Sequence, residues 1–317
     1  MNIIRIADFF CGVGGIRLGF ELASSRFQCV FSNDIDKNAI TTYETNFSSH
    51  PVVCKSISDL TVDEIPDFDI FLGGFPCQSF SIAGNRKGFD DSRGNLFFDI
   101  VRIIRAKKPM IFVLENVKNL KSHQKGETYR KIKNELCRAG YYFKCKIMNS
   151  AEYGNVPQNR ERIYLVGFRD RNLANDFQFP KQILKTKNMI SILENNVIDK
   201  YYYTTHSTIY NTLVESITDN VDTNQVYQYR RHYVRKNMSC LCPTLTANMG
   251  SGGHNVPIIK DNNGIRKLTP RECFSLQGFP KTYNLPELAD SNLYKQAGNS
   301  VTVSVIKRIS QQIVNLL

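Results

Sequence analysis

One cysteine in this chain stands where a nucleophile could act. Cys77 follows Pro76 within residues 73–81 (GGFPCQSFS), directly after the apolar run 69–72 (DIFL). Open α/β sheets carry out their chemistry beyond the carboxyl ends of parallel strands, and a proline there stiffens the turn because it fixes φ and lacks an N–H donor. A small buried hydrophobe is the ordinary alternative for a cysteine, and this stretch taken alone favours that alternative.

Charged and amide side chains flank other apolar runs, and each also has an ordinary structural explanation. Glu115 follows an apolar run, which predicts a carboxylate at the same sheet edge as Cys77; a solvated acid at a strand end is the alternative. Arg160 and Arg162 lead into another run and offer paired donors near that edge, or simply cap it. The stretch 296–301 (QAGNSV) is a further candidate for the same site, and a helix N-cap is its ordinary explanation.

A glycine-rich turn follows the first apolar run. Residues 10–15 (FCGVGG) join a predicted strand to a predicted helix, and glycines let the backbone turn tightly and approach a ligand at a helix N-terminus. The dinucleotide fingerprint G-x-G-x-x-G fails, because Arg17 occupies its last position. Asp34 stands about twenty residues on, at the end of the next apolar run, where an acid can accept hydrogen bonds from ribose hydroxyls.

These features favour an adenosine-type ligand. No phosphate-loop Lys-Ser/Thr accompanies the glycines, which argues against ATP. S-adenosylmethionine, which carries ribose and adenine without phosphates, fits better.

Size and charge bound the function further. The chain has 317 residues, enough for one large α/β domain or for a large and a small one. Its 41 Lys and Arg against 29 Asp and Glu give a net charge of +12 and a pI near 9.2. This balance predicts a polyanionic partner, and a protein that is merely basic is the alternative.

The nine cysteines predict a reducing compartment and no metal site. Their number is odd and no C-x-x-C pair occurs, so neither a zinc knuckle nor a thioredoxin-type motif is expected. The N-terminus lacks the layout of a signal peptide, and no apolar run approaches the ~20 residues that span a bilayer. A cytoplasmic protein with no membrane partner is therefore expected.

Up to about residue 170, short apolar runs alternate with segments of helical period. The predicted strands cover 3–9, 29–32, 70–72, 111–114, 141–147 and 163–168, with amphipathic helices such as 15–23 and 96–106 between them. This alternation predicts an α/β fold with a doubly wound, mostly parallel sheet. Residues 180–265 are rich in Asn, Thr, Tyr and Lys and show no convincing helix before Leu268, which predicts a smaller, irregular second domain. The stretch 300–317 predicts an amphipathic helix that returns to the first domain.

Taken in order, the motifs resemble those of the DNA (cytosine-5) methyltransferases over nearly the whole chain. They are residues 10–15 (FCGVGG), 74–78 (GFPCQ), 115–117 (ENV), 158–162 (QNRER), 271–272 with 277–278 (RE and QG) and 298–301 (GNSV). One such motif is modest evidence, whereas six in the family's order are specific. The resemblance implies an S-adenosylmethionine-dependent methyltransferase fold with a catalytic and cofactor-binding domain over 1–178, a target-recognition domain over 179–286 and a segment 287–317 that returns to the catalytic domain.

The resemblance also implies a reaction at carbon-5 of a cytosine. Carbon-5 is a poor nucleophile, and a thiolate that adds at carbon-6 makes it enamine-like and able to take a methyl group from a sulfonium. Cys77 is the implied thiolate, with its pKa lowered by a helix N-terminus or by cationic groups, and the other eight cysteines keep the ordinary interpretation. A base, water or hydroxide, then removes the carbon-5 proton and the thiol is expelled.

Further roles follow from the same resemblance. Glu115, with a raised pKa, contacts the ring nitrogen and exocyclic amine of the base. Arg162 binds the carbonyl oxygen of the base, and Arg160 helps to hold the loop and backbone around it. The base must be flipped out of the duplex, and residues 78–95 resemble the family's catalytic loop, which closes over it.

The implied cofactor contacts lie in several motifs. They are Phe10, Gly12, Gly14, Gly15, Asp34, Ile35, Ile57, Pro76, Leu96, Asn299, Ser300 and Val301. Two positions depart from the family's pattern: a larger aromatic is usual near Ile35, and Ser56 stands where a second acid often contacts the adenine amine. These departures predict a lower cofactor affinity, or a substitute contact from the backbone of Ile57 and its neighbours.

The irregular segment contains the residues expected to read DNA. Stretches 227–236 (YQYRRHYVRK), 242–247 (CPTLTA) and 248–255 (NMGSGGHN) combine arginines, which suit phosphates and guanine edges, with Gly-rich backbone that can enter a groove. The implied DNA contacts are Ser81, Arg230, Arg231, Arg235, Thr244, Asn248, Gly252, Gly253 and His254. Residues 244–247 match the family's target-recognition signature, and the whole resembles bacterial enzymes that modify sites beginning CC and ending GG. A solvated charged surface is the alternative.

Three other functions fit parts of the sequence. A cytosine deaminase also pairs Pro-Cys with a Glu, yet it needs a P-C-x-x-C zinc pair, and the second cysteine is missing after Cys77. A tRNA cytosine-5 methyltransferase of the same superfamily is the nearer alternative, and the basic, Gly-rich recognition segment favours duplex DNA over it. An inactive DNA-binding regulator is disfavoured by the intact Cys77 and Glu115.

The expected partners follow from this assignment. As the modification enzyme of a bacterial restriction-modification system, the chain is expected to act on double-stranded DNA as a monomer. A cognate restriction endonuclease, where one exists, would not be a stable subunit.

Overall fold

The computed structural model describes residues 2–75, 96–251 and 256–317. Six predicted site residues lie outside these ranges: Pro76, Cys77, Ser81, Gly252, Gly253 and His254. The chain divides into two compact units. Unit 1 comprises Met1–Met148, Glu161–Lys181 and Val305–Leu317, and unit 2 comprises Asn149–Arg160 and Gln182–Ser304.

A seven-stranded sheet forms the centre of unit 1. Its order is β3-β2-β1-β4-β5-β8-β6, with the bounds β1 Ile4–Phe9, β2 Phe27–Asp34, β3 Val53–Cys54, β4 Ile70–Gly74, β5 Ile111–Val117, β6 Tyr142–Asn149 and β8 Glu161–Phe168. The first five strands in this order, β3, β2, β1, β4 and β5, pair with one another in parallel, and β8 runs antiparallel to β5. The predicted mostly parallel sheet is therefore confirmed, and each predicted strand is present with slightly shifted ends.

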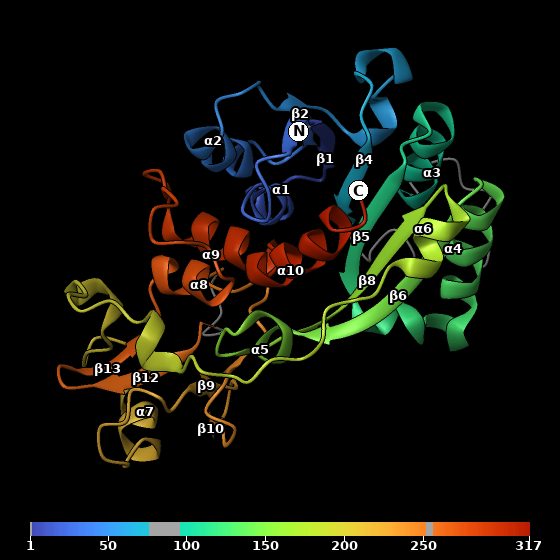
Figure 1. Cartoon of the computed structure of the whole chain (residues 1–317). Helices are drawn as coiled ribbons and strands as arrows, with labels where there is room; N and C mark the ends of the chain where they lie inside the picture. The colour runs from blue at the N-terminus through green and yellow to red at the C-terminus, as the bar shows by residue number, and fades with distance from the viewer. Residues whose placement is uncertain (1, 76–95, 252–255) are drawn as a thin grey trace. The chain divides into compact units, whose positions relative to one another are not determined.

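Helices cover both faces of this sheet. Helices α1 (Gly15–Glu21) and α10 (Val303–Val314) lie on one face, and α3 (Leu96–Lys107) and α4 (Glu127–Arg138) on the other (Figure 1). The other helical elements of unit 1 are α2 (Lys37–Asn46), α6 (Arg171–Asp176) and the 3₁₀ turns Ile57–Asp59, Val62–Glu64, Lys118–Lys121 and His123–Gly126. No helix in the described ranges is both long and apolar enough to cross a membrane.

Helix α10 packs closely on α1, although the two are far apart in the chain. A Cβ atom at Gly19 would lie 2.5 Å from Cγ2 of Ile306, and Ser310 Oγ donates a hydrogen bond to the Gly19 carbonyl oxygen at 3.2 Å across 291 positions. Arg26 draws the chain ends together, because its guanidinium donates to the carbonyl oxygens of Asn2 and Leu317, each at 3.3 Å.

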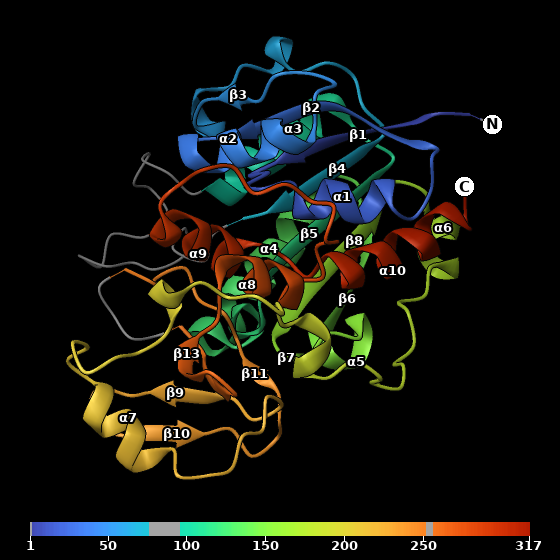
Figure 2. The same ribbon diagram turned by 90° about the vertical axis from the view of Figure 1, so that its left-hand side faces the viewer.

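Unit 2 is built differently, on a small antiparallel sheet. Its order is β10-β9-β12-β13, with the bounds β9 Tyr227–Tyr229, β10 Val234–Lys236, β12 Ile258–Asp261 and β13 Gly264–Lys267. A second pairing joins β7 (Gln158–Asn159) to β11 (Cys242–Pro243) in parallel (Figure 2). Its helices are α5 (Ser150–Gly154), α7 (Tyr210–Ser216), α8 (Pro270–Leu276) and α9 (Asp290–Asn299), and its 3₁₀ turns are Met189–Ile192 and Asp199–Tyr201.

Two sequence predictions about helices were wrong. Helix α7 lies within 180–265, where no helix was expected; it is short, and it forms because Ile209, Leu213 and Ile217 are all buried on one side of it, so packing outweighs weak propensity. The last helix begins at Val303 rather than at residue 300, because Ser300 instead ends α9 in an extended conformation. For the same reason, Asn299 and Ser300 are not a helix N-cap.

Candidate active site

The end of β4 is held against Glu115. Gly74 pairs with Glu115 in the parallel register of β4 and β5, and a Cβ atom at Gly74 would lie 3.5 Å from Glu115 Oε2. Asn116 Nδ2 donates to the Phe75 carbonyl oxygen at 2.9 Å. Backbone bonding and this amide therefore fix the chain up to two residues before Cys77, which itself lies outside the described residues.

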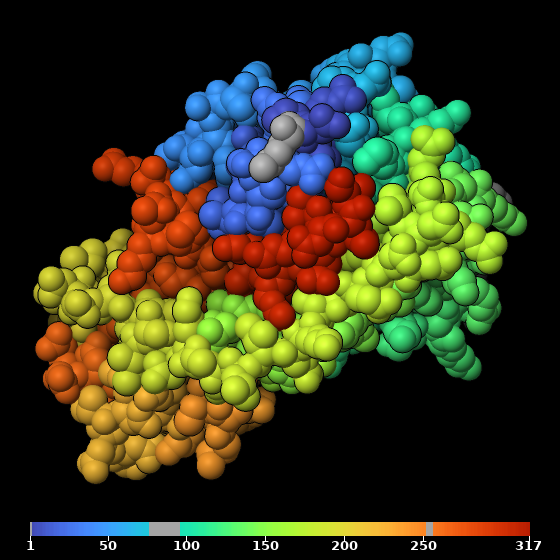
Figure 3. All heavy atoms as spheres, in the orientation of Figure 1, coloured from blue at the N-terminus to red at the C-terminus, as the bar shows by residue number. Residues whose placement is uncertain are grey.

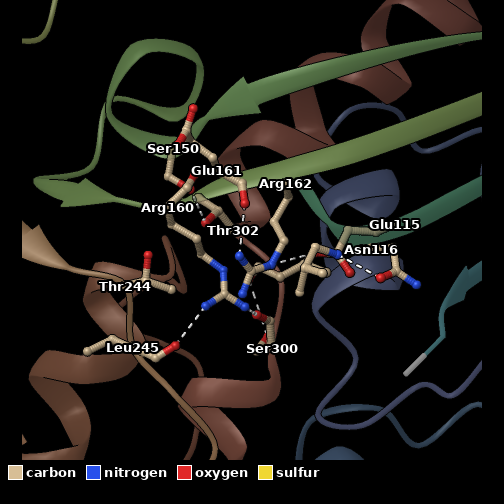
Figure 4. Close-up of polar contacts among 12 residues, drawn as sticks. Glu115, Asn116, Ser150, Arg160, Glu161, Arg162, Thr244, Leu245, Ser300 and Thr302 are labelled. Atoms are coloured by element: carbon tan, nitrogen blue, oxygen red, sulfur yellow. Dashed lines mark hydrogen bonds and ion pairs between the residues drawn. The ribbon is translucent and has the colours of Figure 1, made fainter. Parts of the chain in front are cut away.

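Glu115 and Arg162 meet at the carboxyl end of β5. Arg162 Nε lies 3.1 Å from Glu115 Oε1, and the two side chains are only 15% and 11% exposed. The antiparallel register of β5 and β8 pairs Val117 with Arg162, which explains why the two side chains are in reach (Figure 4). Two of the predicted catalytic residues are thus brought together, each fixed by strand pairing.

The glycine turn after β1 adopts the conformation that its glycines favour. Gly12 and Gly14 have φ angles of 52° and 75°, which glycine adopts without strain, whereas Phe10 holds a φ of 53° that its surroundings must maintain. The Gly12 N–H donates to Asp34 Oδ2 at 2.7 Å, which ties the turn to the end of β2. A Cβ atom at Gly14 would lie 2.3 Å from the Phe47 ring, so packing against α2 also requires glycine there.

This edge of unit 1 fits an adenosine-type ligand. Asp34 Oδ1 accepts hydrogen bonds from the N–H groups of Ile35 and Asp36 at 2.7 and 2.9 Å, and burial raises the pKa of Asp34. Ile35 presents an apolar side chain that is 68% exposed, as a surface for an adenine ring would. Among the described residues, a Cβ atom at Gly12 would meet the Phe10 carbonyl oxygen alone, at 4.0 Å, which leaves room for a ligand to approach the backbone there.

The other predicted cofactor contacts are distributed over both units. In unit 1, Ile57 is buried in the core and Leu96 begins α3, half-buried against the same core. In unit 2, Ser300 and Val301 are buried and Asn299 is exposed. Ser56, which stands in place of a second acid, accepts a hydrogen bond from the Ser58 N–H at 3.3 Å.

Arg17, at the position where the dinucleotide fingerprint fails, supports the glycine turn from within the fold. Its guanidinium donates to Glu21 Oε1, to the Tyr43 hydroxyl and to Ser49 Oγ at 2.7, 3.0 and 2.9 Å. It also lies 4.3 Å from the centre of the Phe47 ring. An arginine at this position therefore joins α1 to α2 by hydrogen bonds and a cation–π contact.

Sequence reasoning missed one buried acid beside this turn. Asp8 lies in β1 and is fully buried, and burial raises its pKa well above the ordinary range despite the nearby Arg17. Neither of its carboxyl oxygens has a side-chain hydrogen-bond partner among the described residues. The available signal was a single charge within an otherwise apolar predicted strand, next to the glycine motif.

Arg160 holds together three segments of unit 2. Its guanidinium donates to the carbonyl oxygens of Leu245, Gly298 and Ser300 at 2.9, 3.2 and 2.6 Å, and the side chain is only 2% exposed (Figure 4). All three acceptors belong to motifs that the sequence singled out. The contacts are those of a residue that positions backbone, and the predicted catalytic role of Arg160 stays a prediction.

Two glutamines extend this connection. Gln158 donates to the Leu276 carbonyl oxygen at 2.9 Å and accepts from the Leu245 N–H at 3.1 Å. Gln277 donates to the Ala297 carbonyl oxygen at 2.7 Å. The stretches 158–160, 244–247, 277–278 and 298–301, distant in sequence, therefore meet around buried side-chain hydrogen bonds in unit 2.

The predicted DNA-reading residues lie on two exposed features of unit 2. Strands β9 and β10 form a hairpin whose tip carries Arg230 and Arg231, with Arg235 on β10, and all three are exposed. Thr244 is anchored by a hydrogen bond from its hydroxyl to the Asn159 carbonyl oxygen at 2.7 Å, and Asn248 is exposed close by in the chain. The structure places these residues without testing what they bind.

Four of the remaining cysteines offer little thiolate. Cys11, Cys29, Cys242 and Cys273 are buried, and burial raises the pKa of each, that of Cys29 to about 11. The thiolate is the reactive form of cysteine. These four positions therefore match the expectation of ordinary core thiols.

Comparison with known proteins gives a consistent result. Residues 4–315 match the family described as C-5 cytosine-specific DNA methylase. The chain is 50% identical over 316 residues to the Type II methyltransferase M.Bsp6I of Bacillus sp. (strain RFL6), covering 98% of both chains. It is 41% identical over 323 residues to the Type II methyltransferase M.HhaI of Haemophilus parahaemolyticus, covering 98% of this chain and 94% of that one. Among solved structures, the Entamoeba histolytica methyltransferase EhMeth is similar over 99% of both chains with a TM-score of 0.79 and 20% identity, a likeness of fold.

Proposed function

Because the chain belongs to the C-5 cytosine-specific DNA methylases, and so is a DNA (cytosine-5) methyltransferase, we propose that it transfers the methyl group of S-adenosylmethionine to carbon-5 of a flipped-out cytosine in double-stranded DNA. The observation that carries the proposal is the Glu115–Arg162 pair, at 3.1 Å, beside the strand end that leads to Cys77. A cytosine presents an amine, a ring nitrogen and a carbonyl oxygen along one edge. A carboxyl group and a guanidinium side by side complement that edge.

Cys77 is the proposed nucleophile. Its thiolate sulfur forms a bond to carbon-6, and the electron pair of the 5,6 double bond moves so that carbon-5 can attack an electrophilic methyl group. Removal of the carbon-5 proton by water or hydroxide then restores the double bond and expels the thiolate. The Cys77 thiolate is regenerated, and the carbon-5 proton passes to water or hydroxide as the methyl group takes its place, so the protein turns over.

Glu115 and Arg162 hold the base during these steps. Glu115 contacts the ring nitrogen and the amine, which draws electron density from the ring and favours addition at carbon-6. Arg162 donates to the carbonyl oxygen, where negative charge gathers after addition. Both residues lie on paired strands, so little reorganisation is required when the base enters.

The glycine turn and Asp34 are the proposed cofactor contacts of unit 1. S-adenosylmethionine, when bound, supplies a sulfonium methyl group as the electrophile. Asp34 would accept hydrogen bonds from the ribose hydroxyls, and the exposed Ile35 side chain would cover the adenine ring. Phe10, Gly12 and Gly15 would surround the methionine end.

The exposed hairpin tip supports a role of unit 2 in sequence recognition. We place the DNA contacts at Arg230, Arg231, Arg235, Thr244 and Asn248, and sites of the type CC…GG are the expected targets. The same proposal includes action as a monomer in the cytoplasm, without a nuclease as a stable subunit.

Expression in a bacterium free of DNA methylation tests the activity. Bisulfite sequencing of its genome should show 5-methylcytosine at one short, recurring site, and a Cys77→Ser variant expressed to the same level should leave the genome unmethylated. An unmethylated genome with the wild-type chain, together with methylation of tRNA, would replace DNA by RNA as the substrate.

Trapping on a modified base tests the covalent step. A duplex with 5-fluorocytosine at the mapped position cannot lose a proton from carbon-5 after methyl transfer, so Cys77 should stay attached to carbon-6. We expect a complex that survives denaturing electrophoresis with the wild-type chain and none with Cys77→Ser. A trapped complex with the serine variant would assign the nucleophile to another residue.

A further inference from the structure

A segment rich in positive charge follows directly after Glu115. Residues 118–138 contain seven Lys and Arg and only two Glu, in a chain whose net charge is +12. They form the two 3₁₀ turns Lys118–Lys121 and His123–Gly126 and helix α4. Figure 3 shows this part of the chain at the surface (green, on the right).

Not all of these charges are compensated. Lys118 forms an ion pair with Glu161, and Arg138 with Glu135. Lys121 and Lys125 are exposed, and neither has an ion-pair partner within the described ranges of the chain. The ammonium groups of Lys121 and Lys125 therefore lie on the segment formed by the two 3₁₀ turns, residues 118–126, which we call the basic turn.

The basic turn is held in a defined shape. Leu120 is buried in the core of unit 1 and is 3% exposed, and His123 Nδ1 lies 2.7 Å from the hydroxyl of the buried Thr128. The two consecutive residues Gln124 and Lys125 have φ angles of 48° and 55°. Such angles cost roughly 1–2 kcal/mol for each residue other than glycine, so the surrounding packing maintains this conformation.

The basic turn begins at the strand end that carries the proposed base contacts. Lys118 follows the last residue of β5, and its partner Glu161 precedes Arg162 in β8. Lys121 lies six positions after Glu115, which limits the distance between their Cα atoms to about 22 Å. B-DNA carries one negative charge per about 1.7 Å of its axis, so several phosphates of a duplex lie within this reach of an extruded base.

We propose that Lys121 and Lys125 bind phosphates of the duplex beside the target base, as a contact separate from sequence recognition by unit 2. This inference rests on the proposed function, because it takes duplex DNA as the substrate. Lysine ammonium groups recognise phosphate as point charges. The contact therefore adds affinity for any sequence and none for a particular one.

Salt dependence of binding tests this contact. The variant Lys121→Gln/Lys125→Gln removes two charges at nearly constant size, and Arg130→Gln/Lys133→Gln is the matched control, because it removes two exposed charges of α4 that likewise have no ion-pair partner among the described residues. A fluorescent duplex of about 30 base pairs is titrated over a range of salt, because each lost phosphate contact lowers the slope of log K against log [salt] by about 0.9. We expect the slope to fall by about 1.8 for the basic-turn variant and to stay nearly unchanged for the control.

Kinetics and folding separate a binding role from a structural one. The basic-turn variant should raise KM for DNA several-fold with kcat and the thermal midpoint unchanged. An unchanged salt slope, or an equal fall in both variants, would overturn the proposal. Because the titration measures binding without methyl transfer, its failure would leave the bisulfite result, and so the proposed function, standing.

Discussion

Two arginines separated by one residue have opposite surroundings. In unit 2, Arg160 is buried and its guanidinium is engaged by three backbone carbonyl oxygens. In unit 1, the Arg162 guanidinium pairs with the Glu115 carboxylate at the end of a strand and donates one hydrogen bond to the Glu161 carbonyl oxygen. Carbonyl acceptors that belong to the chain stay in place, whereas the Glu115 carboxylate can share its partner with an incoming base. The comparison teaches that a charge bound by several backbone carbonyl oxygens serves architecture, and a charge paired with a side chain at a strand end remains available for chemistry.

Replacing Arg160 gives the largest expected effect, on folding. Arg160→Met leaves the carbonyl oxygens of Leu245, Gly298 and Ser300 without this donor, and each unsatisfied buried group costs about 1–3 kcal/mol. We expect the free energy of unfolding to fall by at least about 3 kcal/mol, measured by chemical denaturation. A variant as stable as the wild type would show that Arg160 does not have this structural role.

Replacing Arg162 should affect catalysis instead. Arg162→Met removes one donor from the proposed base site, and the loss of one such donor lowers kcat on the order of 10²-fold. The free energy of unfolding should also fall, because the largely buried Glu115 carboxylate loses its partner. A Glu115→Gln/Arg162→Met double variant should lose less than the sum of the single losses, because the two residues touch. Additive losses, or a variant that is fully active but unstable, would contradict this assignment.

A substitution at Gly298 tests how closely the two segments that Arg160 binds, around Leu245 and around Gly298, must approach each other. A Cβ atom there would lie 2.2 Å from the Thr246 carbonyl oxygen and 2.7 Å from the Ala247 nitrogen, both backbone atoms that cannot move independently. Gly298→Ala should destabilise the chain by roughly 1–3 kcal/mol, the usual cost of overpacking. Thermal denaturation measures it, and a midpoint equal to that of the wild type would mean that this contact is loose.

Asp8 adds a third case, a buried carboxyl group whose oxygens have no side-chain hydrogen-bond partner among the described residues. Burial raises its pKa in the folded chain above the unfolded value of 3.8, so the folded state binds more protons, and stability falls as pH rises above about 4. Asp8→Asn removes this loss. Its stability relative to the wild type should therefore increase between about pH 4 and pH 8 in urea titrations, and parallel profiles would show that Asp8 is compensated in the folded chain.

The sequence predicted the elements of unit 1 better than the environments of its side chains. Strands such as 70–72 and 111–114 are recognisable because both faces are buried and the run is continuously apolar. The pairing of Glu115 with Arg162 depends on the antiparallel register of β5 and β8, which no local pattern specifies. Arg160 and Arg162 look equivalent in the motif QNRER, and only distant segments distinguish them. Helix α7 escaped prediction because the burial of Leu213 within it, and of Ile209 and Ile217 at its two ends, depends on packing in unit 2.

The packing of α10 on α1 has a consequence for how the chain is made. Gly19 and Ser310 are 291 positions apart in the chain. On the ribosome, α1 therefore stays uncovered until α10 has emerged, and unit 2 is synthesised in the interval. Arg26 holds both ends of the chain by their carbonyl oxygens. A circular permutant that joins these ends and opens between Lys181 and Gln182 would place α10 just before β1 and α1. In that order of synthesis, the helix and its partner would emerge one after the other.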